Sequence, residues 1–303
     1  MSDLVLITGG AGMLGQVLAP LLVDAGYRVR SADVRPIEDA PEDVEFVEAD
    51  IRDRAAVEKL VARVRAIVHT AAWHGIHLRE HPAQDFWDLN ATGSFHVYDA
   101  AADAGVEAIV FSSTMGVYGS SRKPAEGGGA VFVNEQLPLV PEDIYGLSKV
   151  LGEQIACDHA TRRGIAGAAL RYGMFVPEPF LREGIRFLYG GVDERDVATA
   201  VMLVLERLLA ERRWIGEFNI ESPLPFSPDD ARGLRDDPIQ VIRKHWPDAS
   251  ELLESAGAEL WGPIEVVYEI DRARRELGWQ PRYGFDSFLT ALRTGATASD
   301  RGV

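Results

Sequence analysis

Tyr145 and Lys149 are four residues apart in a segment that favours a helix, which places their side chains on one face, one turn apart. A phenol has a pKa of about 10 and is a poor base at neutral pH. A lysine ammonium one turn away favours the phenolate and lowers that pKa, so the pair predicts proton transfer with a substrate hydroxyl. A hydroxyl in Ser112–Thr114, after an expected strand, could bind the same substrate oxygen. A Ser/Thr turn that satisfies its own backbone is the alternative for that segment.

A glycine-rich loop follows an expected strand and opens an expected helix, with the sequence GGAGMLG. Gly9 allows a tight turn, Gly12 lets the backbone approach a pyrophosphate, and Gly15 lets helix and strand pack closely. The free N–H groups of Met13 and Leu14 would then face the phosphates, with help from the helix dipole. This context predicts a dinucleotide site, and a plain tight turn is the alternative.

Asp33 lies 18 residues after Gly15, at the end of the second expected strand. A carboxylate at this position accepts hydrogen bonds from the ribose hydroxyls of NAD and repels the 2′-phosphate of NADP. An ordinary turn aspartate is the alternative, and Arg35 could weaken the discrimination. With a nucleotide site upstream, Lys149 can also hold the nicotinamide ribose. We therefore expect NAD as the cofactor.

Strands alternate with helices over the first 171 residues, which predicts parallel pairing because each crossover returns the chain to the same edge. The strands are unbroken apolar runs, as expected for a sheet covered on both faces. The fold class is therefore α/β, a Rossmann-type doubly wound parallel sheet with a small C-terminal substrate lobe. The expected strands are 4–8, 27–32, 44–47, 66–69, 108–112 and 166–171, and the expected helices are 13–25, 54–64, 86–104 and 144–163.

The pattern changes after Pro177, which sets the expected domain boundaries. Further helices are expected at 192–211, 238–246, 251–259 and 286–294, and a short strand at 217–220. We expect an NAD-binding Rossmann domain at 1–177, with 192–220 returning to it, a small lobe at 178–191 and 221–285, and a C-terminal helix and tail at 286–303.

Composition limits the partners and the compartment. A formal net charge of −16 disfavours nucleic acid, because such a surface repels phosphate backbones. The single cysteine, Cys157, excludes an intrachain disulfide, indicates a reducing compartment and is expected to pack as a small residue. No signal peptide opens the chain and no run approaches the roughly 20 apolar residues of a membrane span, so no membrane partner and a cytoplasmic location are expected.

These signals, in this order, resemble the extended short-chain dehydrogenase/reductases, the group of NAD-dependent sugar epimerases and dehydratases. The resemblance covers nearly the whole chain. Matching stretches are TGGAGMLG at 8–15, DIRD at 50–53, HTAA at 69–72, SSTMGVYG at 112–119, RYGMFVP at 171–177, VDERDVA at 192–198 and ELGWQPRY at 276–283. The resemblance implies that Thr114 is the catalytic Ser/Thr, and that cofactor contacts include Asp50, Ile51, Ala71, Ala72, Asn90 and Tyr172.

The implied reaction is oxidation of a sugar hydroxyl. Tyr145 would take the hydroxyl proton while a hydride passes to the nicotinamide, and Thr114 would orient the substrate oxygen. Dehydratases of this group carry an acidic pair directly after the catalytic Ser/Thr, whereas this chain has Met115 and Gly116, so dehydration is disfavoured. Val176 stands where glycine is usual.

A short segment of 14 residues, 178–191, separates Pro177 from Val192. Nucleotide-sugar enzymes of this group carry a much longer segment, which helps to hold the base and diphosphate of the substrate. The shortening favours a smaller substrate, such as a free sugar, a uronic acid or a sugar-like alcohol, and uronate dehydrogenases of the group are similarly compact. The region 223–263 partly restores the size of the lobe.

Several side chains are candidates for contact with the substrate. A histidine beside the HTAA segment could assist proton transfer or bind a carboxylate, and arginines of the short lobe could bind an anionic group. A polar surface loop and a solvated helix face are the respective alternatives, and no metal site is expected. The candidates are Trp73, His74, His77, Ser113, Met115, Arg182 and Arg186.

Three functions agree with these residues to different degrees. The first is an NAD-dependent oxidoreductase that releases NADH, and the second is an epimerase that returns the hydride to the other face of a keto intermediate. The third, a non-catalytic NAD-binding protein, is disfavoured because it need not keep the Tyr145/Lys149 pair. Relatives in this group often form homodimers through two long helices, here 86–104 and 144–163, so a homodimer is expected.

Overall fold

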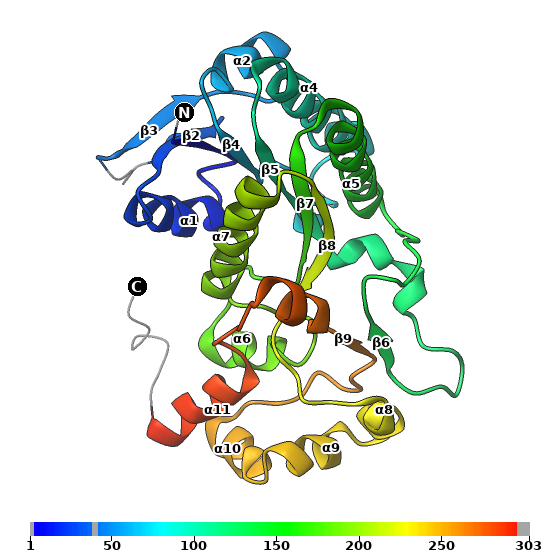
Figure 1. The fold of residues 1–303 in the computed structure, drawn as a ribbon. Helices are drawn as coiled ribbons and strands as arrows, with labels where there is room; N and C mark the ends of the chain where they lie inside the picture. The colour runs from blue at the N-terminus through cyan, green and yellow to red at the C-terminus, as the bar shows by residue number, and fades with distance from the viewer. Residues whose placement is uncertain (1–2, 38–41, 296–303) are drawn as a thin grey trace. The chain divides into compact units, whose positions relative to one another are not determined.

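A seven-stranded sheet is the largest sheet of the computed structural model, which describes residues 3–37 and 42–295. The strand order is β3-β2-β1-β4-β5-β7-β8 (Figure 1). β1 pairs in parallel with β2 and with β4, and the pairs β2/β3 and β4/β5 are also parallel, which confirms the doubly wound fold. The strands are β1 Leu4–Thr8, β2 Arg28–Asp33, β3 Val44–Glu48, β4 Ala66–His69, β5 Ala108–Thr114, β7 Ala166–Tyr172 and β8 Trp214–Ile220.

Helices cover both faces of this sheet. α2, α4 and α5 lie on one face, and α1 and α7 lie on the other (Figure 1). Every residue of β1, β4 and β7 is buried, as the unbroken apolar runs predict. The helices are α1 Met13–Asp24, α2 Arg54–Leu60, α3 Ala83–Phe86, α4 Ser94–Ala104, α5 Ile144–Arg163 and α7 Glu194–Glu211.

The strand order reverses at β1, because β2 and β3 lie on one side of it and β4 and β5 on the other. In doubly wound sheets, ligands bind beyond the carboxyl ends of the strands at such a point. The glycine-rich loop follows β1 and the HTAA segment follows β4, so the topology places both beside this point.

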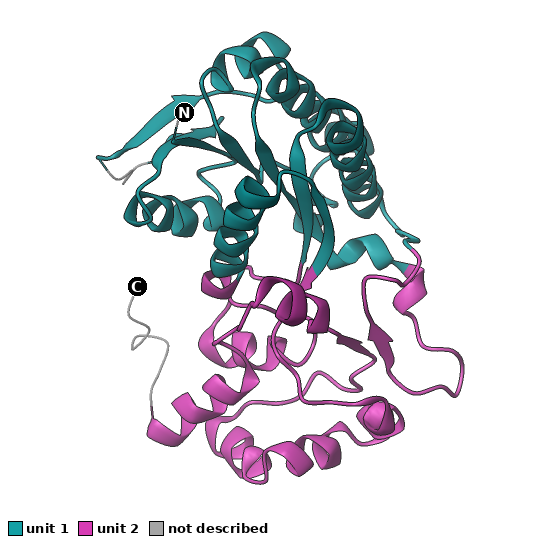
Figure 2. Ribbon diagram, in the orientation of Figure 1, with its two compact units in different colours: residues 1–119, 139–171, 197–218 teal, residues 120–138, 172–196, 219–303 magenta. Residues whose placement is uncertain are grey.

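Contacts along the chain define two compact units (Figure 2). Unit 1 comprises 1–119, 139–171 and 197–218, and unit 2 comprises 120–138, 172–196 and 219–303. Residues 120–138, which we expected in the Rossmann domain, belong to unit 2 because β6, Val131–Val133, pairs in parallel with β9, Val266–Tyr268. Residues 296–303 of the expected tail lie outside the described residues.

Unit 2 has its own aromatic core. Trp246 and Phe285 lie edge to face with ring centroids 4.9 Å apart, and Phe288 packs beside them. Its helices are α6 Phe180–Arg186, α8 Ala231–Asp236, α9 Pro238–His245, α10 Ala249–Ala256 and α11 Phe285–Thr294. Short 3₁₀ turns occur at Gly75–His77, Met115–Tyr118, Ser120–Arg122 and Pro228–Asp230, and a π-helical turn at Ala273–Leu277.

Two local expectations were wrong. Cys157 is exposed rather than packed, although its neighbour Ala156 is buried. Successive helical residues point about 100° apart, so a residue next to a buried one can face solvent. The helix expected at 86–104 is also not regular, because a π-helical segment, Trp87–Gly93, joins α3 to α4. Such segments are frequent at functional sites.

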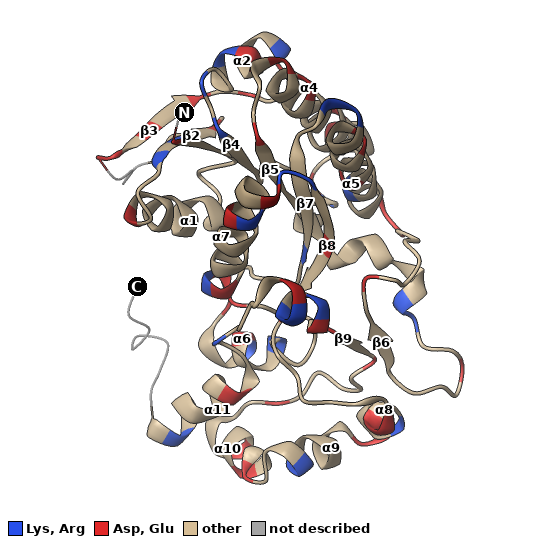
Figure 3. Ribbon diagram, viewed as in Figure 1, with Lys and Arg blue, Asp and Glu red and all other residues tan. Residues whose placement is uncertain are grey.

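Charged residues of both signs occur along the helices (Figure 3). Arg54–Glu58 in α2 and Arg207–Glu211 in α7 are pairs spaced by four residues. Exposed pairs of this kind are screened by solvent and contribute little to stability, so they do not determine the fold. In the part of the chain that the structure describes, no helix has the length and apolar character needed to cross a membrane.

Candidate active site

Three glycines of the loop after β1 are needed for close packing. Gly9 has φ +74°, and a Cβ on it would lie 2.7 Å from the backbone N of Ala71. A Cβ on Gly10 would lie 1.8 Å from Oγ of Ser31, and one on Gly15 would lie 2.6 Å from the carbonyl oxygen of Gly10. These positions hold the loop against β2, the segment after β4 and its own helix.

Gly12 differs from the other glycines, because a Cβ on it would approach only the carbonyl oxygen of Gly9, at 3.1 Å. It is the N-cap of α1, and no side chain caps this helix or places an acidic group in its first turn. The first amides of a helix have no partner within the helix, so those of Met13 and Leu14 can receive an anion. The open backbone and the uncapped helix fit a pyrophosphate.

Asp33 connects this loop to the end of β2. Its side chain is largely buried, and its two oxygens accept hydrogen bonds from the N–H groups of Ala11 and Arg35, each at 3.0 Å. The guanidinium of Arg35 is exposed and lies 3.6 Å from the same carboxylate. Asp33 is therefore fixed beside the loop, where a nucleotide ribose would be bound.

Asp50 and Ile51, both expected to contact the cofactor, have different environments. The carboxylate of Asp50 accepts hydrogen bonds from Arg52, and this interaction lowers its pKa. Ile51 is buried, and a Cβ on Gly93 would lie 2.8 Å from its side chain. The carbonyl oxygen of Ile51 is 3.2 Å from Nδ1 of His96.

A buried network of hydrogen bonds holds the segment after β4 that contains Ala71 and Ala72. Nδ1 of His69 is 2.7 Å from Oγ1 of Thr8, and Nε2 is 2.9 Å from Oγ of Ser94. Burial lowers the pKa of His69 to about 3, so the ring is neutral at pH 7. The hydroxyl of Thr8 also accepts hydrogen bonds from the N–H groups of Thr70 and Ala71.

Asn90, in the π-helical segment, has its amide bound by protein groups. Its Oδ1 accepts from the N–H of Trp73 at 2.7 Å, and its Nδ2 donates to the carbonyl oxygen of Trp73 and to Oγ of Ser148. Ser148 lies between Tyr145 and Lys149 on α5, so Asn90 joins the loop after β4 to the helix of the expected catalytic pair. We propose that it acts on the cofactor by positioning these elements.

Tyr145 and Lys149 lie on successive turns of α5, whose N-terminus is capped by Asp143. Burial raises the pKa of Tyr145 to about 12, and a hydrogen bond with Thr114 acts in the opposite direction. Thr114 is the last residue of β5, which is two residues longer than expected. The structure therefore brings Tyr145 and Thr114 together.

Lys149 is buried, and its Nζ donates to the carbonyl oxygen of Ser112 at 2.8 Å. Burial lowers its pKa to about 7, and the charge of Glu153 opposes this shift. We expected the ammonium to lower the pKa of Tyr145, but Thr114 is the group that does so in the protein alone. The amine is instead held at the end of β5.

A buried ion pair behind these residues was not predicted. Arg171 donates to both oxygens of Glu153, at 2.9 and 2.7 Å, and to the hydroxyl of Tyr118. Ser113, which we expected near the substrate, donates its hydroxyl to Glu153 at 2.5 Å and is buried. Glu153 follows Lys149 by four residues, and this spacing was the only sequence signal for its place.

The loop after β4 places aromatic rings beside the expected catalytic tyrosine. The rings of His74 and Tyr145 are stacked, with centroids 6.3 Å apart and planes at 18°. His77 accepts a hydrogen bond at Nδ1 from the N–H of His74. Trp73 stacks on His81 at 3.9 Å, and its buried Nε1 has no hydrogen-bond partner among the described residues.

The remaining candidates have protein partners that define their surroundings. Met115 is buried and begins the 3₁₀ turn after Thr114, so it is not an exposed substrate contact in this structure. Tyr172, at the end of β7, packs edge to face on Phe175 at 5.7 Å.

In unit 2, Arg182 and Arg186 both donate to Glu178 and both lie over the ring of Trp261. The hydrogen bonds from Arg186 and then Arg182 lower the pKa of Glu178. Part of the positive charge that we expected for an anionic substrate is therefore offset by this carboxylate.

Comparison with known proteins finds sequences that are similar to this chain. Residues 5–179 match the NAD dependent epimerase/dehydratase family. The chain is 35% identical to uronate dehydrogenase of Pseudomonas putida over 176 residues, which cover 57% of this chain and 62% of that enzyme. The match thus spans less than two thirds of the relative's length. Over 93% of both chains, it is 32% identical to UDP-glucose 4-epimerase of Bacillus subtilis.

The fold has solved counterparts. A short-chain dehydrogenase/reductase superfamily protein from Agrobacterium tumefaciens, solved with bound NAD, has a TM-score of 0.73 to this structure. Its sequence is 21% identical, and the match covers 96% of each chain. At this identity the likeness concerns the fold.

Proposed function

Because the chain belongs to the NAD-dependent epimerase/dehydratase family, we propose that it is an NAD-dependent oxidoreductase that oxidises a hydroxyl group of a sugar or sugar acid. The observation that carries this proposal is the hydrogen bond between Tyr145 and Thr114, with Lys149 one turn along α5. Uronate dehydrogenases at 35% and 34% identity, together with the short segment 178–191, support an acidic monosaccharide as the substrate.

The residues of unit 1 fit a dinucleotide. We propose that Gly9, Gly12 and Gly15 cradle its pyrophosphate with the amides of Met13 and Leu14, and that Asp33 accepts the adenosine ribose hydroxyls. Asp50, Ile51, Ala71, Ala72 and Tyr172 are proposed as further contacts. When bound, NAD supplies the hydride acceptor.

The chain's own groups handle the proton. Tyr145 takes the proton of the substrate hydroxyl, and Thr114 orients the same oxygen through its hydroxyl. Because Tyr145 on its own has a pKa of about 12, it needs a nearby positive charge to act near neutral pH. Lys149 supplies that charge when it is protonated, and the carboxylate of Glu153 favours its protonated form.

A second candidate function is an epimerase, which would use the same three residues. The 32% identity to the Bacillus subtilis UDP-glucose 4-epimerase over 93% of both chains favours it. The absence of a longer segment at 178–191 counts against a nucleotide-sugar substrate. A non-catalytic NAD-binding protein is disfavoured, because a sensor has no need for the Tyr145–Thr114 hydrogen bond.

Absorbance at 340 nm separates these functions. The purified protein with added NAD is screened against uronic acids, free sugars, and UDP- and dTDP-sugars. NADH that accumulates with a uronate or free sugar supports the dehydrogenase. No net NADH, together with isomerisation of a nucleotide sugar in the same wells, supports the epimerase instead, and neither signal with any sugar would contradict both.

Replacing Asp33 with alanine should weaken NAD binding about 10-fold or more, because charge-assisted hydrogen bonds contribute about 1.5–3 kcal/mol. Asp33→Asn is the matched control: it keeps an acceptor for the N–H of Ala11 but removes the charge that would repel a 2′-phosphate. Fluorescence titration with NADH and NADPH measures both effects. We expect Asp33→Asn to narrow the ratio of the two affinities, and an unchanged ratio would mean that Asp33 does not select the cofactor.

We propose that the protein is a homodimer that pairs through α4, α5 and the π-helical segment. Trp87, Phe95 and Leu147 are each at least 40% exposed there, and large apolar side chains on adjoining helices favour association. Light scattering should give twice the 33.2 kDa mass of one chain, and Phe95→Asp should give one chain mass. A monomeric wild-type protein would exclude this interface.

A further inference from the structure

Three backbone segments of unit 2, residues 173–174, 190–192 and 220–222, are hydrogen bonded to one another, and we call them the neck. The chain enters and leaves residues 175–189, which contain α6, through the neck, so the neck fixes both ends of that segment. Four bonds of 2.9–3.1 Å hold it, from the N–H groups of Gly173, Met174, Val192 and Ser222 to the carbonyl oxygens of Ile220, Gly190, Met174 and Gly191 respectively.

The carboxyl group of Glu221 is packed inside this neck. Glu221 is 2% exposed, and its Oε1 has no hydrogen-bond partner among the described residues. A Cβ on Gly173 would lie 2.4 Å from its Oε2, and a Cβ on Gly190 would lie 3.7 Å from its Oε1. The carboxyl therefore fills space that a side chain at Gly173 would need, and it lies between two of the three neck segments.

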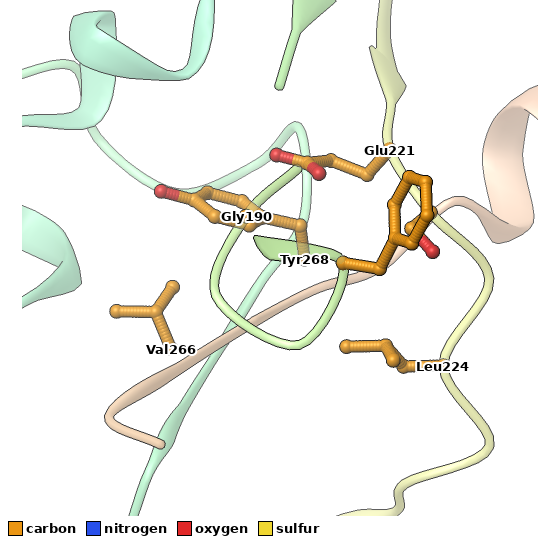
Figure 4. A pocket seen from close by; sticks show the side chains of 7 residues that line it. Gly190, Glu221, Leu224, Val266 and Tyr268 are labelled. Carbon is orange, nitrogen blue, oxygen red and sulfur yellow. The ribbon is translucent and has the colours of Figure 1, made fainter. Parts of the chain in front are cut away.

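The other walls around this carboxyl are mainly apolar. Figure 4 shows the carboxyl beside the ring of Tyr268, with Val266 and Leu224 across the pocket. The space between these groups is too small to hold a water molecule. Nη1 of Arg122 donates to the hydroxyl of Tyr268 at 2.5 Å. Arg122 and Tyr268 are the charged and titratable groups that act on Glu221, and both belong to unit 2.

The closed neck suits the neutral form of this carboxyl and not its anion. Burial raises the pKa of Glu221 well above its usual range, and the N–H of Ser222 and the charge of Arg122 only partly oppose this shift. A carboxylate needs hydrogen bonds from water or from protein donors to all of its lone pairs. The closed neck leaves Oε1 without such a donor and has no room for water.

We propose that Glu221 is a proton-dependent lock: its protonated carboxyl keeps the neck closed, and loss of the proton breaks the backbone bonds of the neck so that water reaches the carboxylate. The proposal concerns unit 2 alone and does not depend on the proposed function. Because the pKa is raised in the closed state, closure is most stable below about pH 4.5, the usual pKa of a glutamic acid. Its stability falls as the pH rises from there toward the raised pKa.

Hydrogen exchange of the full-length protein, measured by mass spectrometry from pH 5 to pH 8, tests this lock. The rates are first corrected for the intrinsic effect of pH on exchange. The opening equilibrium at the neck amides of Met174, Val192 and Ser222 should then rise by up to about 10-fold per pH unit, because each opening releases up to one proton. The amides of α10, in the same unit, should not respond.

Glu221→Gln is the decisive variant, because it keeps the size of the carboxyl group but cannot ionise. The corrected exchange of its neck amides should not depend on pH. Ser222→Ala is the matched control, since it removes a neighbouring buried hydroxyl that also has no partner among the described residues but does not titrate in this range. It should keep the pH dependence of the wild type. The same pH dependence in Glu221→Gln as in the wild type would assign the effect to another group and overturn the proposal.

Thermal unfolding shows whether Glu221 ionises locally or only when the whole unit unfolds. The Tm advantage of Glu221→Gln over the wild type should grow from pH 5 to pH 8, because only the wild type loses stability when the carboxyl ionises. If this advantage grows while exchange at the neck does not change with pH, the carboxyl ionises only on complete unfolding and there is no lock. An advantage that does not change with pH would also overturn the proposal. These outcomes leave the proposed function untouched, because neither NAD nor a sugar is present.

Discussion

Replacing Tyr145 with phenylalanine should lower kcat by about 10³-fold or more, at the upper part of the range for loss of a general acid–base group. The hydroxyl is the only part of the side chain that the substitution removes. The phenyl ring keeps the stacked contact with His74, and Gly75 still packs against it. NAD affinity should therefore change little, because the glycine-rich loop and Asp33 are untouched.

The measurement pairs initial rates of NADH formation with a fluorescence titration of NADH. Thr114→Val is the companion variant, since it removes the hydroxyl that binds Tyr145 and keeps the branched shape. Thr114→Val should lower kcat by less than Tyr145→Phe does, because the hydroxyl of Thr114 orients the substrate oxygen but does not take its proton. Turnover that persists in Tyr145→Phe would show that another group, such as His74, acts as the base.

The sequence predicted the parts of this site whose signals are local. A glycine that must turn sharply, such as Gly9, and a pair spaced by one helical turn, such as Tyr145 and Lys149, can be recognised within a few residues. The parallel pairing of the strands and the two covered faces of the sheet followed from the same kind of local pattern. These features needed no knowledge of distant contacts.

The distant partners of several candidate residues were not predicted from the sequence. Ser113 was expected at the substrate, but its hydroxyl binds Glu153, 40 positions away. Asn90 was expected at the cofactor, but its amide holds the loop at Trp73.

The effect of the Lys149 charge on the pKa of Tyr145 was also predicted too simply. Four-residue spacing on a helix brings two side chains to one face, but it does not say which neighbour each will bond. Lys149 bonds the carbonyl oxygen of Ser112, and burial brings its pKa to about 7. The electrostatics of the pair therefore depend on Glu153, to which the sequence analysis assigned no role.

Removing one partner of the Glu153–Arg171 pair should cost about 3–5 kcal/mol of unfolding free energy, because it leaves an uncompensated charge in the core. Both side chains are 5% exposed or less. Glu153→Gln is the sharpest single change, since it keeps the shape and an acceptor for Ser113 but removes the negative charge. Urea unfolding followed by circular dichroism measures the loss.

The double variant Glu153→Leu/Arg171→Met is the matched control, because apolar residues of similar volume can replace a buried ion pair at little cost or with a gain. It should recover most of the stability lost in Glu153→Gln. It should not recover activity, since Glu153 also supports the protonated form of Lys149 and bonds Ser113 beside Thr114. In both variants the pKa of Lys149 should fall below about 7, which would shift the alkaline limb of the kcat profile to lower pH. Full activity in the double variant would mean that the pair serves stability alone and that Lys149 keeps its charge by other means.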